Sequence, residues 1–295
     1  MQELSEIRLC AASELDLEKT FECGQCFRWN RQGEAYVGIA RGRAARLSYQ
    51  GGDVMIECEA EDISLWRHYF DMDLDYSVIS FGDAGEYFAA CEEFGRGIRI
   101  LRQEFWEALC SFVISQCNNI PRIKGIVESL CRGFGEPLEF GGEIYYSFPG
   151  ADILASLPTE ELAPLRAGYR APYIISAARA VVSGELRPET LGSREEAVRA
   201  LCGVNGVGKK VASCTALYGL HDMTGFPIDT WMKRALANHF PKNFTPEVFG
   251  EYAGLAQQYI FYYARTNGTS SSSSPHSAPR IAESSVARTC SSFSE

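Results

Sequence analysis

The stretch 201–236, LCGVNGVGKKVASCTALYGLHDMTGFPIDTWMKRAL, decides how the rest of the 295-residue chain is interpreted. Its first half places Gly206, Val207 and Gly208 between two segments with helical patterns. Glycines at a helix start permit a tight turn, and the helix dipole favours an anion near the free N–H groups. The stretch therefore predicts a helical hairpin whose turn binds phosphate.

The second half of this stretch adds a lysine and a carboxylate. Lys210 lies on the helix that the glycines begin, and Asp229 follows Pro227 in GFPID, residues 225–229. Proline disfavours helix before it, so the next helix is expected to begin with Asp229 as its N-cap. A lysine amine near a carboxylate can attack an electrophilic sugar carbon and form a Schiff base. GVG before a lysine is also typical of ordinary helix starts, but its combination with GFPID is far more specific.

These features together resemble the signature of helix-hairpin-helix DNA glycosylases. The resemblance implies that Asp229 is catalytic and that Lys210 marks the bifunctional branch, which removes a base and cuts the resulting abasic site. It also implies DNA contacts by the hairpin turn, Gly206, Val207 and Gly208. Lys209 is the rival nucleophile, although it points about 100° around the helix from Lys210.

Charge is distributed unevenly along the chain, whose net charge is −10. Residues 1–97 contain 19 Asp and Glu against 9 Lys and Arg, so this third carries the whole excess. The remaining residues are balanced and can place local basic patches on DNA, with weak and salt-sensitive non-specific binding.

The composition indicates an intracellular protein. Eleven cysteines without a framework spacing fit reduced thiols better than disulfides. No apolar run approaches the ~20 residues of a membrane span, and the N-terminus lacks the features of a signal peptide. We expect no membrane association, and a location in the cytoplasm or nucleoid, or in the nucleus of a eukaryote.

Residues 1 to about 60 show short alternating stretches separated by turn signals, which predicts an antiparallel sheet. The pair Cys23 and Cys26 forms a CxxC, but no second CxxC and no βαβ pattern accompany it, so redox or zinc chemistry is not favoured. GQCFRW, residues 24–29, instead resembles 8-oxoguanine DNA glycosylases. The resemblance implies that the Gly24 carbonyl reaches a flipped base, a role that suits glycine because it lacks Cβ.

Helical patterns follow from residue 85 onward, after a link at 62–80. Two apolar helices are separated by QCNN, residues 116–119, which is either a capped junction or, by resemblance, a loop that fills the gap left by a flipped base. The resemblance gives Asn118 and Asn119 to this loop and lets Arg122 reach the partner base. Family members commonly show three asparagines here. The first is Cys117, a poorer hydrogen-bonding group, so recognition of the orphaned cytosine is expected to be looser or differently built.

Three further segments extend the resemblance. In GYRAPY, residues 168–173, Tyr169 is either a core residue or a DNA wedge that replaces lost stacking, with Arg170 contacting the orphan base. Trp231 stands where the family often has histidine, and its indole N–H can substitute as a phosphate donor. Gln257 and Phe261 share one helix face. In the family this pair bonds and stacks the flipped purine, whereas on a generic helix it would be an exposed amide and a core ring.

Three smaller expectations complete the site and the chain. Cys214 lies one turn after Lys210, so it is either a wall of the base pocket or a buried small residue. The segment 193–202 reads as the first hairpin helix, with Ser193 and Glu196 as a capping box. The Ser-rich sequence from 266 cannot bury enough apolar surface and is expected to be a disordered tail.

The sequence therefore predicts an α+β fold. An N-terminal antiparallel sheet domain (1–80) would pack on a mostly helical HhH-GPD glycosylase body (81–265), followed by the tail (266–295). The predicted function is excision of 8-oxoguanine from duplex DNA by base flipping, lysine attack on C1′ and β-elimination, in base excision repair. We expect a monomer that needs no cofactor and no metal and whose partner is double-stranded DNA with oxidised guanine.

Three alternatives were open. An alkylated-purine glycosylase usually lacks the lysine, and a non-catalytic hairpin needs only the glycines. A relative with an iron–sulfur cluster needs four cysteines after the hairpin, but only Cys290 follows Cys214.

Overall fold

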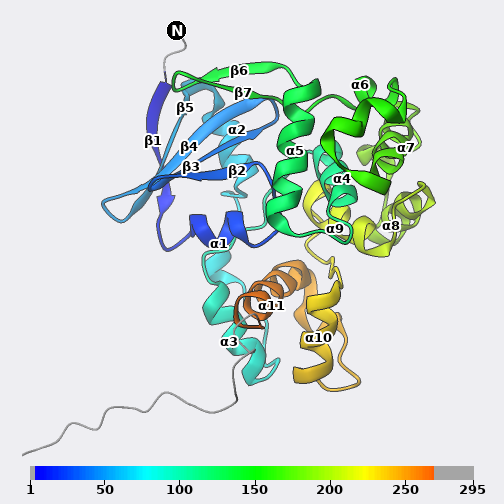
Figure 1. The fold of residues 1–295 in the computed structure, drawn as a ribbon. Helices are drawn as coiled ribbons and strands as arrows, with labels where there is room; N and C mark the ends of the chain where they lie inside the picture. Colours follow the sequence, from blue (N-terminus) through cyan, green and yellow to red (C-terminus); the bar gives the residue numbers. More distant parts are fainter. Residues whose placement is uncertain (1–3, 269–295) are drawn as a thin grey trace, which may run out of the picture.

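The computed structural model describes residues 4–268, and it consists of a five-stranded sheet beside a largely helical body (Figure 1). The expected fold class is confirmed. Most of the expected tail, residues 269–295, lies outside the described residues. The sheet is antiparallel with the order β1-β5-β4-β3-β2. Its strands are β1 (Leu4–Ala11), β2 (Trp29–Gln32), β3 (Ala35–Ala40), β4 (Arg43–Gln50) and β5 (Asp53–Glu59).

The alternation of apolar residues along the strands determines which face of the sheet packs on the core. In β5, Val54, Ile56 and Cys58 are buried and the residues between them are only partly covered, as expected for a strand with one face on a core. That face packs on an aromatic cluster in which Trp29 and Trp66 are fully buried.

Two helices cover the aromatic cluster, α1 (Leu17–Glu22) and α2 (Ile63–Tyr69). The pattern of residues 1–60 did not predict α1, which interrupts the sheet. Its start is fixed by Asp16, whose side chain accepts from the Lys19 N–H at 3.0 Å. Asp16 itself has an extended backbone, so the extended segment before α1 ends at this N-cap.

The helical body is organised around α4, every residue of which is buried. Helix α9 packs along it, so the helix that follows the hairpin turn rests on the centre of the core. The helices are α3 (Glu86–Gly95), α4 (Phe105–Ile114), α5 (Ile120–Phe134), α6 (Ala151–Ala155), α7 (Ala171–Val182), α8 (Arg194–Gly203), α9 (Lys209–Gly219), α10 (Thr230–His239) and α11 (Ala253–Gly268).

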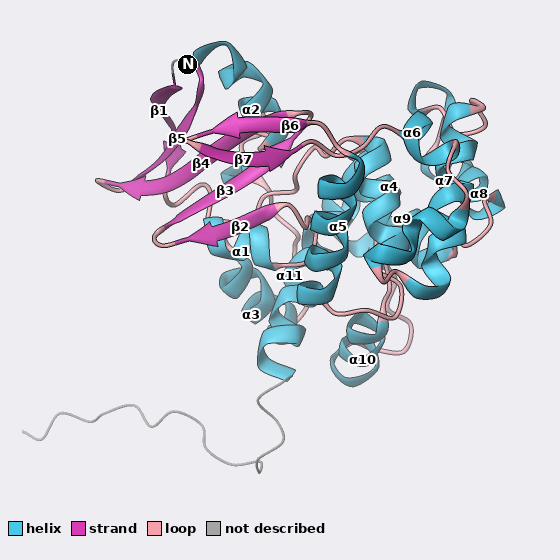
Figure 2. Ribbon diagram, turned by 45° about the horizontal axis from the view of Figure 1, so that its top comes forward, coloured by secondary structure: helices cyan, strands magenta, loops and turns pink. Residues whose placement is uncertain are grey.

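A second antiparallel pair, β6 (Pro137–Phe140) and β7 (Glu143–Tyr146), precedes α6. It lies beside the main sheet (Figure 2). Short 3-10 turns complete the chain: η1 (Ala60–Asp62), η2 (Tyr76–Val78), η3 (Thr159–Leu165), η4 (Gly168–Arg170), η5 (Pro188–Thr190) and η6 (Pro246–Tyr252).

The C-terminal helix returns to the N-terminal part of the chain. Helix α11 packs against α3 and α10 (Figure 1). Its side chains also donate to carbonyls at the end of α1, those of Glu22 and Cys23. The chain kinks within η6 (Pro246–Tyr252) at Gly250 (φ 58°), before α11 begins at Ala253. Helix α11 then continues to Gly268, past the residue where the tail was expected to begin.

Two buried clusters correspond to the sheet and to the helical body. The sheet cluster contains residues up to Phe70 and, from later in the chain, Leu101. The helical cluster takes nearly all its residues from Phe81 onward, but it also includes Cys23 and Phe27. The domain boundary at residue 80 stays a prediction. Within residues 4–268, no helix is long and apolar enough to cross a membrane.

Candidate active site

The hairpin turn joins α8 to α9. The expected capping box at the start of α8 is present, with Ser193 N–H donating to Glu196 Oε2 at 2.8 Å. Gly206 has φ +87°, and a Cβ there would lie 2.1 Å from Tyr173 Cγ, so only glycine fits. Val207 is buried, and its N–H donates to the Val204 carbonyl at 3.0 Å within the turn. Gly208 is the N-cap of α9 and offers no side-chain cap, so the first-turn N–H groups remain for an anion.

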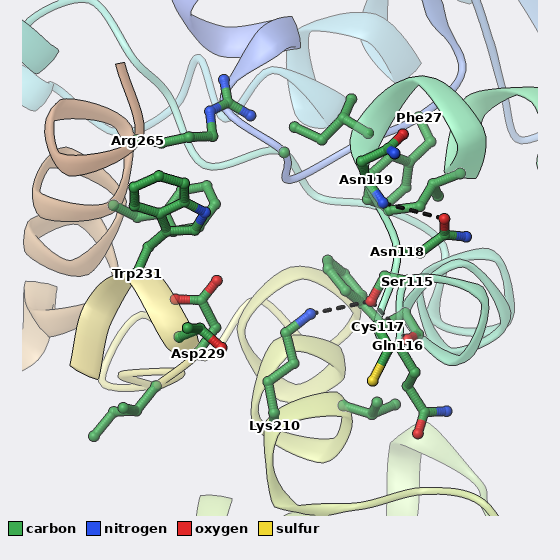
Figure 3. A pocket seen from close by; sticks show the side chains of 18 of the residues that line it. Phe27, Ser115, Gln116, Cys117, Asn118, Asn119, Lys210, Asp229, Trp231 and Arg265 are labelled. Carbon is green, nitrogen blue, oxygen red and sulfur yellow. Dashed lines mark hydrogen bonds between the residues drawn. The ribbon is translucent and has the colours of Figure 1, made fainter. Parts of the chain in front are cut away.

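Lys210 and Asp229 face one cavity from opposite sides (Figure 3). The Lys210 amine donates to Ser115 Oγ at 3.0 Å and lies 5.2 Å from the Phe112 ring centroid. Asp229 is the N-cap of α10, as predicted, and accepts from the Met232 N–H at 2.8 Å. Lys209 is exposed, whereas Lys210 is partly buried. The structure therefore presents Lys210, and not its neighbour, to the cavity.

This cavity measures about 720 Å³ and continues into an inner recess of about 50 Å³. Both spaces are lined by Gly24, Phe112, Lys210, Asp229 and Phe261. The recess alone adds the predicted Cys214 and Gln257, together with Cys23, Tyr218, Pro227 and Gln258. The structure thus brings together all six residues that the sequence assigned to catalysis and the base pocket.

The recess combines a backbone corner with an unpaired amide. Gly24 has φ +83°, and a Cβ there would approach Ile120 Cδ1 to 3.2 Å and Phe261 Cε1 to 3.4 Å. Gln257 is 5% exposed, and within residues 4–268 its Oε1 has no hydrogen-bond partner. Burial raises the pKa of the Cys214 thiol, and the nearby Lys210 ammonium opposes that rise. A buried amide without a partner is costly, which indicates a ligand in the recess.

The loop between α4 and α5 carries a different kind of surface. Asn119 caps α5 and accepts from the Arg122 N–H at 3.0 Å, so the junction is capped as one interpretation proposed. Asn118 donates to the Ile114 carbonyl at 3.3 Å. Cys117 is exposed and has φ +48°, a conformation that few residues other than glycine adopt. Arg122 is exposed, and its guanidinium lies 3.4 Å from the Arg166 carbonyl.

Tyr169 and Arg170 hold this loop in different ways. Tyr169 is 52% exposed, so it is not a core residue, and its hydroxyl donates to the Gln116 carbonyl at 3.2 Å. Arg170 is 3% exposed and donates to the carbonyls of Gln116 and Cys117. Its predicted contact with the orphan base stays a prediction, and it requires the guanidinium to leave these carbonyls. In this conformation Arg170 fixes the loop.

Trp231 and the CxxC cysteines have contrasting environments. Trp231 lines the cavity (Figure 3). Its ring centroid lies 5.7 Å from the Arg234 guanidinium. Cys23 and Cys26 are buried, and burial raises the pKa of Cys23 to about 11 and that of Cys26 well above its ordinary value. Neutral buried thiols are typical of core residues. Over the range 4–268, no group of three or more His, Cys, Asp or Glu could hold a metal.

Among the lining residues that the sequence did not predict are Phe112, Ser115, Tyr218 and Gln258. Tyr218 follows Lys210 and Cys214 at a four-residue spacing, so helical periodicity could have identified it. The other three carried no local signal.

A hairpin turn, a lysine and an aspartate that meet in one cavity of this fold define a helix-hairpin-helix DNA glycosylase. Two family models match the chain. Residues 8–109 match the N-terminal domain of 8-oxoguanine DNA glycosylase, and residues 110–247 match the HhH-GPD superfamily of base excision DNA repair proteins.

Individual relatives agree with the family models. The N-glycosylase/DNA lyase OGG1 of Arabidopsis thaliana is 31% identical over 287 residues, covering 84% of this chain and 77% of that protein. A structure of MBOgg1 with a low-affinity DNA ligand is 38% identical, with a TM-score of 0.82 over 90% of this chain and 96% of the other.

A third relative is the 8-oxoguanine glycosylase/lyase of Clostridium acetobutylicum, in complex with double-stranded DNA containing cytosine opposite 8-oxoguanine. It is 33% identical, with a TM-score of 0.80 over 91% of this chain and 100% of that one. The chain described here belongs to the 8-oxoguanine DNA glycosylase family.

Proposed function

We propose that this protein excises 8-oxoguanine from duplex DNA and then cleaves the strand, with Lys210 as nucleophile. The protein is a DNA N-glycosylase and lyase of base excision repair, and its partner is double-stranded DNA. The observation that carries the residue assignments is the convergence of Lys210, Asp229 and the base-pocket residues on one recessed cavity. Enzymes that act on a base inside a duplex must first extrude it into such a pocket.

Lys210 attacks C1′ of the extruded nucleotide. The new C1′–N bond forms as the bond from C1′ to the base nitrogen breaks, and the base leaves with that electron pair. The amine nitrogen then loses its two protons, one taken up by the departed base and one by O4′ as the C1′–O4′ bond breaks, and an imine forms at C1′. Removal of a proton from C2′ then expels the 3′ phosphate by β-elimination. The bond to Ser115 Oγ and the Phe112 ring hold the amine in place before substrate arrives.

Asp229 stabilises the positive charge that develops on the sugar as the base departs. The Met232 N–H fixes one of its oxygens at the start of α10, and the carboxylate lines the cavity opposite Lys210. A preorganised charge of this kind stabilises the transition state more than it does the ground state.

The base pocket reads the chemical difference between guanine and 8-oxoguanine. Guanine N7 is only an acceptor, whereas the oxidised base carries a hydrogen there. The Gly24 carbonyl accepts from that hydrogen and faces a repelling lone pair in guanine. Gln257, whose Oε1 is buried and unpaired among the described residues, bonds the edge of the purine. Phe261 stacks on one face of the ring, and Cys214 forms a wall of the pocket.

The remaining predicted residues hold the DNA around the extruded nucleotide. The backbone at Gly206, Val207 and Gly208 binds phosphate at the start of α9. Trp231 donates from its indole N–H to a neighbouring phosphate. The vacated step and the orphan base are contacted by five further residues: Asn118, Asn119, Arg122, Tyr169 and Arg170. Because the substrate is duplex DNA, the proposed location is the cytoplasm or nucleoid, or the nucleus of a eukaryote.

A single glycosylase assay tests this proposal. Duplexes carrying 8-oxoguanine opposite each of the four bases are compared with duplexes carrying guanine or an alkylated purine. The proposal expects excision of 8-oxoguanine and strand cleavage, with guanine left intact. Strong excision of the alkylated purine with 8-oxoguanine ignored would overturn the substrate and leave the lysine chemistry standing.

A further inference from the structure

The backbone of segment 22–25, which carries Gly24, accepts hydrogen bonds from side chains in distant parts of the chain. Arg265 donates to the Glu22 carbonyl. Gln258 donates to the Cys23 carbonyl at 3.0 Å, and Gln103 donates to the Gln25 carbonyl at 2.7 Å. Three of these four successive carbonyls are thus occupied, and the carbonyl of Gly24 is the one between them.

Such support is needed because Gly24 cannot hold its own peptide in place. Glycine has no side chain to restrict rotation, and its φ of +83° lies where the other residues are strained. Hydrogen bonds to the Cys23 and Gln25 carbonyls on either side restrict the Gly24 peptide. They leave the Gly24 carbonyl itself free to accept from a ligand.

The orientation of Gln258 is itself determined. The Cys23 carbonyl can only accept, so the amide nitrogen of Gln258 must face it. The amide oxygen therefore faces Tyr218, whose hydroxyl must donate to it. Gln258 is 1% and Tyr218 is 4% exposed. Burial holds the pKa of Tyr218 well above its ordinary value, so the hydroxyl keeps the proton that it donates.

The same network begins on the catalytic helix. Lys210, Cys214 and Tyr218 follow one another at four-residue intervals on α9, and all three line the recess. The Tyr218 carbonyl also accepts from the Gln103 N–H at 3.1 Å. The helix that carries the nucleophile is thus linked by hydrogen bonds to the corner that carries Gly24.

We propose that Gln258, oriented by Tyr218, is a positioning residue that aims the Gly24 carbonyl at the lesion, with Arg265 and Gln103 as further supports. We refer to these four side chains as the carbonyl clamp. This role rests on the proposed function. The clamp sets discrimination between 8-oxoguanine and guanine, and it takes no part in the chemistry at C1′.

Two reactions of the same enzyme distinguish loss of the carbonyl clamp from general damage to the fold. Excision of 8-oxoguanine opposite cytosine requires the Gly24 carbonyl, whereas cleavage at a preformed abasic site requires Lys210 but no base. For Gln258→Met, which keeps the length of the side chain and removes both polar atoms, single-turnover excision should fall about tenfold because buried partners are left unpaired. Abasic-site cleavage should stay within about twofold. Equal loss of both rates, or no loss of either, contradicts the clamp.

A second variant covers the case in which Gln258→Met does not fold. Tyr218→Phe removes one hydroxyl, and excision alone should fall about threefold to fivefold. Its matched control is Tyr69→Phe, which removes a buried hydroxyl that accepts from Trp29 under the sheet and should leave the ratio of the two rates unchanged.

The wild-type protein on the same duplexes keeps the two proposals distinguishable. If it cleaves abasic sites but ignores 8-oxoguanine, the proposed function fails and the clamp's role in reading the lesion fails with it. If it excises 8-oxoguanine and the variants keep the wild-type ratio, the clamp alone is overturned.

Discussion

The base recess and the loop between α4 and α5 lie on the same cavity but are built differently. The corner at Gly24 is held by donors from α11, which are Gln258 and Arg265, and by Gln103 from the segment before α4. The loop at Cys117 and Asn118 is exposed or half-exposed, and its own carbonyls bind Arg170 and Tyr169. The recess is therefore preorganised, whereas the groups assigned to the orphan base are engaged with one another.

This difference indicates that the two halves of recognition are separable. Groups that are fixed before binding lose little conformational freedom when the ligand arrives. The loop must exchange its internal hydrogen bonds for contacts to DNA, so its selectivity is expected to be weaker. Variants of the recess should alter the choice of lesion, and variants of the loop should alter the choice of opposite base.

The largest effect on excision is expected at Lys210, because its chemistry is needed whichever lesion and opposite base are recognised. Lys210→Gln removes the nucleophile and should reduce excision by roughly four orders of magnitude or more, whatever the lesion or the opposite base. Lys209→Gln is the matched control, because Lys209 is the exposed neighbour. Single-turnover assays of both variants would measure this. Loss of excision in the Lys209 variant with activity kept in the Lys210 variant would reverse the assignment.

Asp229→Asn should produce the next largest effect. Asparagine caps a helix as well as aspartate does, so the fold and the affinity for duplex DNA should survive. Removal of the charge near the reacting sugar should slow excision by roughly 10²–10³-fold. Thermal unfolding and a binding titration with an abasic-site duplex provide the controls. Wild-type excision rates would leave Asp229 as a helix cap and nothing more.

Gly24→Ala tests the recess by itself. The backbone at φ +83° and the 3.2 Å approach to Ile120 both oppose a methyl group. A residue in such a sparsely populated conformation costs about 1–3 kcal/mol, so excision of 8-oxoguanine should fall roughly 10–100-fold. The loss should be the same opposite all four bases, with cleavage of abasic sites retained. A loss confined to one opposite base would mean that the two halves are coupled.

Cys117→Asn tests the loop and should have the smallest effect. Asparagine tolerates the φ of +48° better than cysteine does and supplies an amide toward the orphan base. Preference for cytosine over adenine opposite the lesion should rise about fivefold, with discrimination against guanine excision unchanged. Cys202→Asn, at an exposed cysteine on α8, is the control. An unchanged preference would remove Cys117 from recognition of the opposite base.

Local signals in the sequence predicted much of the fold and the positions of Lys210 and Asp229 on it. The capping box at Ser193 and the N-cap at Asp229 each depend on residues within one turn, and both are present as predicted. The four-residue spacing from Gln257 to Phe261 predicted one shared helix face, and both residues line the recess.

Long-range contacts explain what the sequence did not reveal. Gln258 meets the Cys23 carbonyl across 235 residues, and Lys210 meets Ser115 across 95. No local pattern distinguishes Gln258 from its neighbour Gln257, because their different roles depend on which element each one faces after folding. The sequence also did not predict that Arg170 donates to the loop carbonyls of Gln116 and Cys117.

The most direct test of the central claim is to map the covalent intermediate. The protein is mixed with a duplex containing 8-oxoguanine opposite cytosine, reduced with borohydride, digested and sequenced by mass spectrometry. The imine chemistry proposed here predicts a stable protein–DNA adduct at Lys210 alone. An adduct at Lys209, or excision of the base without any trapped adduct, would contradict it.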